Sequence, residues 1–170
     1  MDEADWERRL SAAWGSIDER SDAEQVALIE SLAAELPADS AVAAFERASV
    51  QDSTGHSDLA VPLYQEALRR GLGGARHRQA VIQLASSLRN LDRPQESVEL
   101  LAAELAARSD DLDDAVRAFL ALALADAGRE REAVSVVLAA LVPYLPRYQR
   151  SVANYARLLV SDEPGDGERS

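Results

Sequence analysis

The chain has 170 residues, of which 47% are hydrophobic but only 5% aromatic, and its formal net charge is −12. Because it has no cysteine, the sequence excludes disulfides, thiolate metal sites and cysteine nucleophiles. The negative charge opposes binding to nucleic acids and anionic membranes, and the acidic N-terminus has no apolar run long enough for a signal peptide or a membrane span. We therefore expect a cytoplasmic protein with neither nucleic acid nor membrane as a partner.

Apolar residues recur at helical spacing along almost the whole chain, beginning with Trp6, and no stretch alternates like a strand. The second predicted helix opens with a capping box at residues 21–24 and ends at Pro37, and Asp39 is placed to cap a third helix that runs to about Ser53. Later breaks fall at Gly55, at residues 71–74, 92–94 and 110–111, and at Gly128. These signals predict an all-α protein of about nine helices joined by short connections.

The breaks are periodic. Gly55, Asp92 and Gly128 lie 37 and 36 residues apart, and aligning the chain on them brings small residues into shared columns: Ala48, Ala85 and Ala121 before the break, and Ala60, Ser97 and Ala133 after it. A lone helix pair cannot bury its whole apolar surface, so such pairs must stack, with small residues where helices approach most closely. Pro94 then opens the second helix of the middle pair, where its missing N–H costs nothing.

Two stretches, Gly55…Ala60…Tyr64…Ala67 and Gly128…Ala133…Val137…Ala140, resemble the tetratricopeptide repeat, as does "AVIQLASSLRNLDRPQESVELL". The resemblance is to small stand-alone proteins of high-GC bacteria, whose genomes also favour arginine, the only basic residue here besides histidine. It implies a right-handed α-solenoid of antiparallel helix hairpins. We expect a capping helix pair in residues 1–38, three degenerate repeats in 39–143, a capping helix in 144–161 and a disordered tail in 162–170.

Chemical sites find little support. His56 and His77 flank one predicted helix and lie ~20 Å apart, and the four acids of residues 109–114 suit a helix N-terminus better than a calcium loop. The chain has no phosphate-binding loop and no nucleophile elbow. We expect no catalytic activity, no cofactor and no metal.

The resemblance implies that the first helix of each pair lines a concave face. Carrying the family's outward positions across selects Phe45 and Ser49 in the first repeat, Gln79, Ile82, Ser86, Arg89 and Asn90 in the second, with Gln83 beside them, and Ala118 and Leu122 in the third. Along the last helix, Arg150 and Asn154 share a polar side with Arg147 and Arg157, opposite a core-facing stripe of Tyr148, Val152, Tyr155 and Leu159. Amides and guanidinium groups can bind a peptide backbone or carboxylate, although ordinary solvation of a helix face would explain both these arginines and the polar residues of the middle repeat.

Charge is unevenly distributed. Residues 1–40 hold eleven acids and three arginines, whereas residues 69–93 hold six arginines and one acid. The leading hypothesis is a non-catalytic scaffold for protein–protein interaction whose groove binds a peptide segment of a partner protein, acidic in character. The alternative is a structural homodimer, in which the acidic N-terminal pair meets the basic stretch, with Trp6 or Trp14 in the contact.

Overall fold

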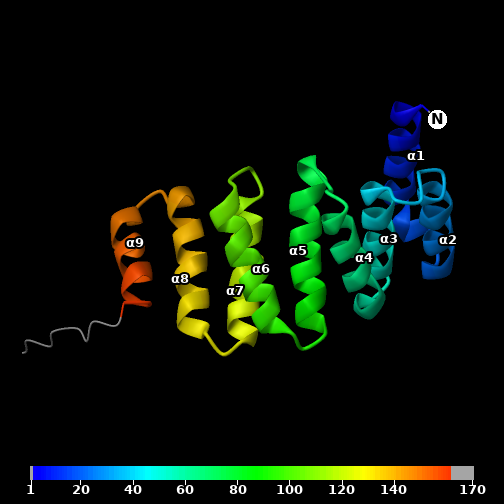
Figure 1. Cartoon of the computed structure of the whole chain (residues 1–170). Helices are drawn as coiled ribbons and strands as arrows, with labels where there is room; N and C mark the ends of the chain where they lie inside the picture. The colour runs from blue at the N-terminus through cyan, green and yellow to red at the C-terminus, as the bar shows by residue number, and fades with distance from the viewer. Residues whose placement is uncertain (1, 162–170) are drawn as a thin grey trace, which may run out of the picture. The chain divides into compact units, whose positions relative to one another are not determined.

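The computed structural model describes residues 2–161, and the predicted disordered tail, residues 162–170, lies outside them. The described residues form nine α-helices and two short 3₁₀ helices, with no strand (Figure 1). The all-α class predicted from the sequence is confirmed. The elements are α1 (Glu3–Gly15), η1 (Ile17–Glu19), α2 (Asp22–Ala33), α3 (Ala41–Ser53), α4 (Ser57–Arg69), α5 (Gly74–Asn90), α6 (Pro94–Ala107), α7 (Asp113–Asp126), α8 (Glu130–Leu141), η2 (Val142–Tyr144) and α9 (Gln149–Leu158).

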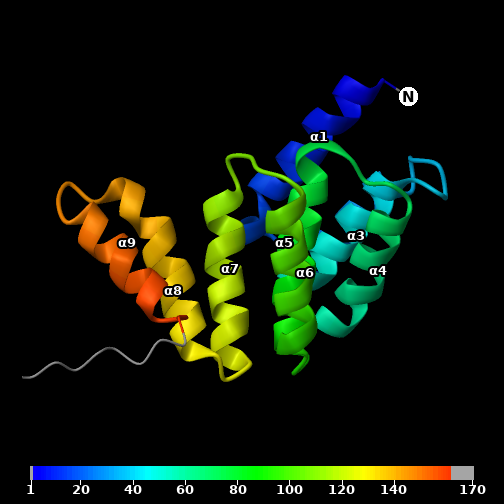
Figure 2. The ribbon, with the colours of Figure 1, turned by 60° about the vertical axis from the view of Figure 1, so that its left-hand side comes forward.

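Within residues 2–161, the helices fall into two compact units: unit 1 ends at Arg93 and unit 2 begins at Pro94. In unit 1, each helix from α1 to α5 packs against the next, and α3 also contacts α5, so the first helices of two successive pairs lie together. In unit 2, α6 packs on α7, α7 on α8 and α8 on α9; Figures 1 and 2 both show the last three side by side. Each unit is thus a row of helices that cover one another's apolar sides.

Local capping explains where several helices start. Ser21 and Glu24 form the predicted reciprocal capping box at the start of α2. The cap of α3 is Ser40, whose Oγ accepts a hydrogen bond from the backbone N–H of Ala43, and not Asp39 as predicted. Both side chains suit the role, but only Ser40 directly precedes the first helical residue. Pro94 is the first residue of α6, as predicted.

The three periodic breaks share one backbone conformation. Gly55, Asp92 and Gly128 have φ of 83°, 57° and 73°, in the left-handed region. After each of them, the next residue's N–H bonds the carbonyl five residues back, at 2.9, 3.0 and 2.8 Å. This is the Schellman motif, which closes a helix with a left-handed residue that is usually glycine. The repeated glycine column therefore has a backbone cause, and Asp92 is its one departure.

Small side chains form part of the core, at positions in the aligned columns where close helix contacts were predicted. Ala48, Ala60 and Ala85 are wholly buried in unit 1, and Trp6 at its start is 2% exposed. The Trp6 indole N–H donates to the Leu32 carbonyl at 2.9 Å, which ties α1 to α2. Within residues 2–161, no helix is long and apolar enough to cross a membrane.

The predicted core-facing stripe of α9 is wrong at its two tyrosines. Tyr148 and Tyr155 are 74% and 63% exposed. The face that packs on α8 centres on Ala156, whose carbonyl accepts a hydrogen bond from Ser135 Oγ at 2.7 Å, with Val152 and Leu159 half-buried beside it. A small residue lets the two backbones approach closely there, and this rotates the larger tyrosines outward.

Candidate functional site

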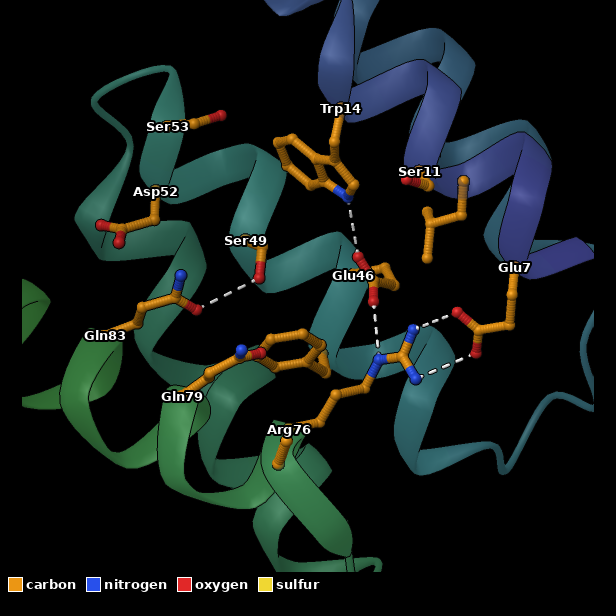
Figure 3. A pocket seen from close by; sticks show the side chains of 13 residues that line it. Glu7, Ser11, Trp14, Glu46, Ser49, Asp52, Ser53, Arg76, Gln79 and Gln83 are labelled. Carbon is orange, nitrogen blue, oxygen red and sulfur yellow. Dashed lines mark hydrogen bonds and ion pairs between the residues drawn. The ribbon is translucent and has the colours of Figure 1, made fainter. Parts of the chain in front are cut away.

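A pocket with a volume of about 850 Å³ opens between three helices of unit 1 (Figure 3). Each helix contributes residues at spacings of three and four, which place side chains on one helical face. The lining residues are Glu7, Leu10, Ser11 and Trp14 of α1; Phe45, Glu46, Ser49, Asp52 and Ser53 of α3; and Ala75, Arg76, Gln79 and Gln83 of α5.

The guanidinium of Arg76 joins all three walls. Its two terminal nitrogens donate to the two carboxylate oxygens of Glu7 at 2.9 and 2.7 Å, and its Nε donates to Glu46 Oε1 at 3.1 Å. The other oxygen of Glu46 accepts from the indole N–H of Trp14 at 2.9 Å. Paired charge-assisted bonds of this kind have defined directions, so the network sets how α1 lies against α3 and α5 (Figure 3).

Glu46 is an acid that the fold buries. It is 3% exposed, and burial raises the pKa of its carboxyl above the ordinary value, although the hydrogen bond from Trp14 and the charge of Arg76 act in the opposite direction. Its charged form is therefore stabilised less by the folded protein than by water. Removing Trp14 or Arg76 would raise the pKa of Glu46 further.

A second polar group lies along the pocket between α3 and α5. Gln83 Oε1 accepts hydrogen bonds from the Tyr64 hydroxyl at 2.9 Å and from Ser49 Oγ at 3.3 Å. Further along, Ser87 Oγ donates to Asp52 Oδ1 at 2.7 Å. Burial raises the pKa of Asp52, opposed by hydrogen bonds from Ser87 and Tyr64. The donors to this carboxylate are thus neutral hydroxyl groups.

The sequence model of the Tetratrico peptide repeat family matches residues 41–159, from the start of α3 to just beyond the end of α9. The chain belongs to the tetratricopeptide repeat family. Comparisons with curated proteins and with solved structures found no match. Tetratricopeptide repeats generally mediate protein–protein interactions and are typically non-catalytic. In the part of the chain that the structure describes, no group of three or more His, Cys, Asp and Glu side chains is placed to hold a metal ion.

Four of the residues selected through the tetratricopeptide resemblance line the unit 1 pocket: Phe45, Ser49, Gln79 and Gln83. Ser86, Arg89 and Asn90 follow on α5 but are not part of its lining, and Ile82 is 8% exposed. Asn90 Nδ2 donates to Ser57 Oγ at 3.2 Å, which ties the end of α5 to α4. The sequence thus identified two lining residues on α3 and two on α5.

The other selected residues lie in unit 2. Arg150 and Asn154 line a separate hollow on α9 of about 500 Å³, and the side-chain oxygen of Asn154 accepts from Arg157 at 2.5 Å. Ala118 and Leu122 line an apolar hollow of about 460 Å³ between α7 and α8. The predicted set therefore does not form one site within either unit.

Sequence reasoning missed five charged or aromatic lining residues: Glu7, Trp14, Glu46, Asp52 and Arg76. Glu7 and Trp14 belong to α1, which precedes the region that matches the tetratricopeptide family, so no family position could be carried onto them. Their spacing of seven residues, with Leu10 and Ser11 between them, was the available signal that one face of α1 continues the pocket.

Proposed function

We propose that the unit 1 pocket binds a peptide segment of a partner protein. The observation that carries the proposal is a concave pocket in a tetratricopeptide repeat chain that combines an apolar surface with amide and hydroxyl groups. Phe45, Leu10 and Trp14 supply the apolar part, while Gln79 and Gln83 supply amides that both donate and accept hydrogen bonds. Such a mixture suits an extended backbone with apolar side chains.

The walls of the pocket are fixed before any ligand arrives. The Arg76 network holds α1 against the other two walls, and Phe45, whose ring lies 6.1 Å from that of Tyr64, is 5% exposed. A preformed site loses less conformational entropy on binding than one that must assemble. Gln79, in contrast, is exposed, which leaves its amide accessible to a ligand.

Blocking the pocket tests the proposal. The full chain is screened against a random peptide library. The selected peptides are then titrated against Gln79→Trp, which places a bulky ring in the pocket lining, and against Gln65→Trp, which adds the same ring to an exposed glutamine of α4 outside it. We expect Gln79→Trp to lose binding and Gln65→Trp to keep it. Peptides that bind both variants equally well would place the binding surface elsewhere.

The structure removes the reasons for two expectations from the sequence, the homodimer and the acidic character of the partner. The charge complementarity invoked for a homodimer is met within one chain, since Glu7 of the acidic N-terminal region pairs with Arg76 of the basic stretch. Trp6 is buried, and the Trp14 indole N–H donates to Glu46. The acidic character of the partner rested on the arginines of residues 69–93, and none of those six is without a partner. The proposal therefore rests on the pocket.

A further inference from the structure

One carboxylate of the pocket has no cation beside it. Asp52 lies in the last turn of α3 and is half-buried. Glu7 and Glu46 both pair with Arg76, whereas no arginine or histidine within residues 2–161 forms an ion pair with Asp52. The neutral hydroxyl groups of Ser87 and Tyr64 lie beside it instead. A partly desolvated carboxylate that has only neutral donors is less stable than one paired with a cation.

The surroundings of Asp52 add to the negative potential. The lining contains three carboxylates, from Glu7, Glu46 and Asp52, and one guanidinium, from Arg76. Asp52 and Ser53 also stand at the C-terminal end of α3, where the helix dipole carries a partial negative charge that favours cations. The carboxylate of Asp52, the C-terminal end of α3 and the excess of carboxylates in the lining therefore all favour a positively charged ligand.

The pocket also offers what the rest of a long basic side chain needs. Ser49 and Ser53 place hydroxyl groups on the same wall as Asp52, and Trp14 faces the pocket from α1 (Figure 3). Lysine and arginine bury their aliphatic stems against apolar surface while their charged ends reach a polar group, and an indole ring attracts a nearby cation. An acidic side chain would find no free cation among the described lining residues, because Arg76 is already paired with Glu7 and Glu46. The first turn of α5, where Ala75 and Arg76 line the pocket, favours anions, but these two carboxylates already lie beside it.

We infer that the pocket receives an arginine or lysine side chain of the partner segment, with the carboxylate of Asp52 as its ionic partner. This inference rests on the proposed function, because it assigns the chemistry of the segment that the pocket would bind. The sequence had suggested an acidic partner segment, and this inference replaces it with a basic one. The partner class is thus a protein with an exposed basic segment.

The test uses the full chain and a peptide library whose central position is fixed in turn as arginine, lysine, glutamine or glutamate. We expect the arginine and lysine pools to bind about tenfold more tightly than the glutamine pool, the effect of one charge-assisted bond, and the glutamate pool to bind most weakly. Because the pair is partly exposed to solvent, the preference should shrink as salt is added. This salt dependence is measured on the unaltered protein and needs no variant.

Asp52→Asn keeps the shape and removes the charge, so it should abolish the preference for basic pools while neutral pools still bind. Asp39→Asn is the matched control, since Asp39 is exposed and lies outside the pocket; it should keep the preference. The inference is overturned if the glutamate pool binds as well as the arginine pool, or if the preference for basic pools survives in Asp52→Asn. Neither result would contradict the proposal that the unit 1 pocket binds a peptide segment. If no pool binds the unaltered chain, both proposals fail.

Discussion

Replacing Arg76 with alanine should destabilise unit 1 by leaving a buried carboxylate without its cation. Removing one partner of a buried pair costs about 3–5 kcal/mol. The Arg76 side chain is 28% exposed, so water can partly replace it, and we expect a decrease in the free energy of unfolding of about 2–3 kcal/mol at neutral pH. Most of that decrease comes from Glu46, because the carboxylate of Glu7 is 41% exposed and can be hydrated.

The decrease should depend on pH in a defined direction. The folded protein already holds the pKa of Glu46 above its ordinary value of 4.5, and the loss of Arg76 removes two interactions that lower it. An acid whose pKa is higher in the folded than in the unfolded state costs stability as pH rises above the unfolded value. The difference between the unaltered protein and Arg76→Ala should therefore be small below pH 4.5 and grow as the pH approaches neutrality.

Urea denaturation followed by tryptophan fluorescence measures this directly, because both tryptophans, Trp6 and Trp14, lie in α1 and report on unit 1. The control is Arg9→Ala. Arg9 also makes a bidentate pair, with Glu35 at 2.7 and 2.6 Å, and a third bond to Asp5, but these side chains are exposed. Its removal should cost much less. A destabilisation by Arg76→Ala that is the same at pH 4.5 and at neutral pH would refute the role given to Glu46.

Three further changes have distinct expected effects. Asp92→Gly should raise the free energy of unfolding by about 0.5–1 kcal/mol, because Asp92 has a φ of 57° that glycine adopts without strain; unchanged or lower stability in chemical denaturation would contradict this. Tyr64→Phe should lower it by about 1 kcal/mol through loss of the 2.9 Å bond to Gln83, with the same measurement as the check. Ser21→Ala should cost about 1 kcal/mol by removing the capping box with Glu24; a thermal midpoint equal to that of the unaltered protein would speak against it.

Some features of the fold could be read along the chain because their causes are local. The glycine column, the capping box and Pro94 depend on backbone dihedrals and hydrogen bonds within a few residues. The predictions failed where the outcome depends on where a helix begins or on how it packs against another helix. Asp39 and Ser40 are equivalent as caps until the first helical residue is known, and the tyrosines of α9 turn outward because Ala156 is the residue that meets α8.

An all-helical tetratricopeptide repeat protein could be predicted from local patterns, since an apolar period and recurring left-handed turns are properties of short segments. Which charges meet depends on how the helices pack. Glu7 and Arg76 are 69 residues apart yet form a bidentate pair, while Asp52 receives no cation from the described chain. Electrostatic energy depends on distance in space and on burial, so a count of charges along the sequence could not give the sign of the electrostatic potential in the pocket.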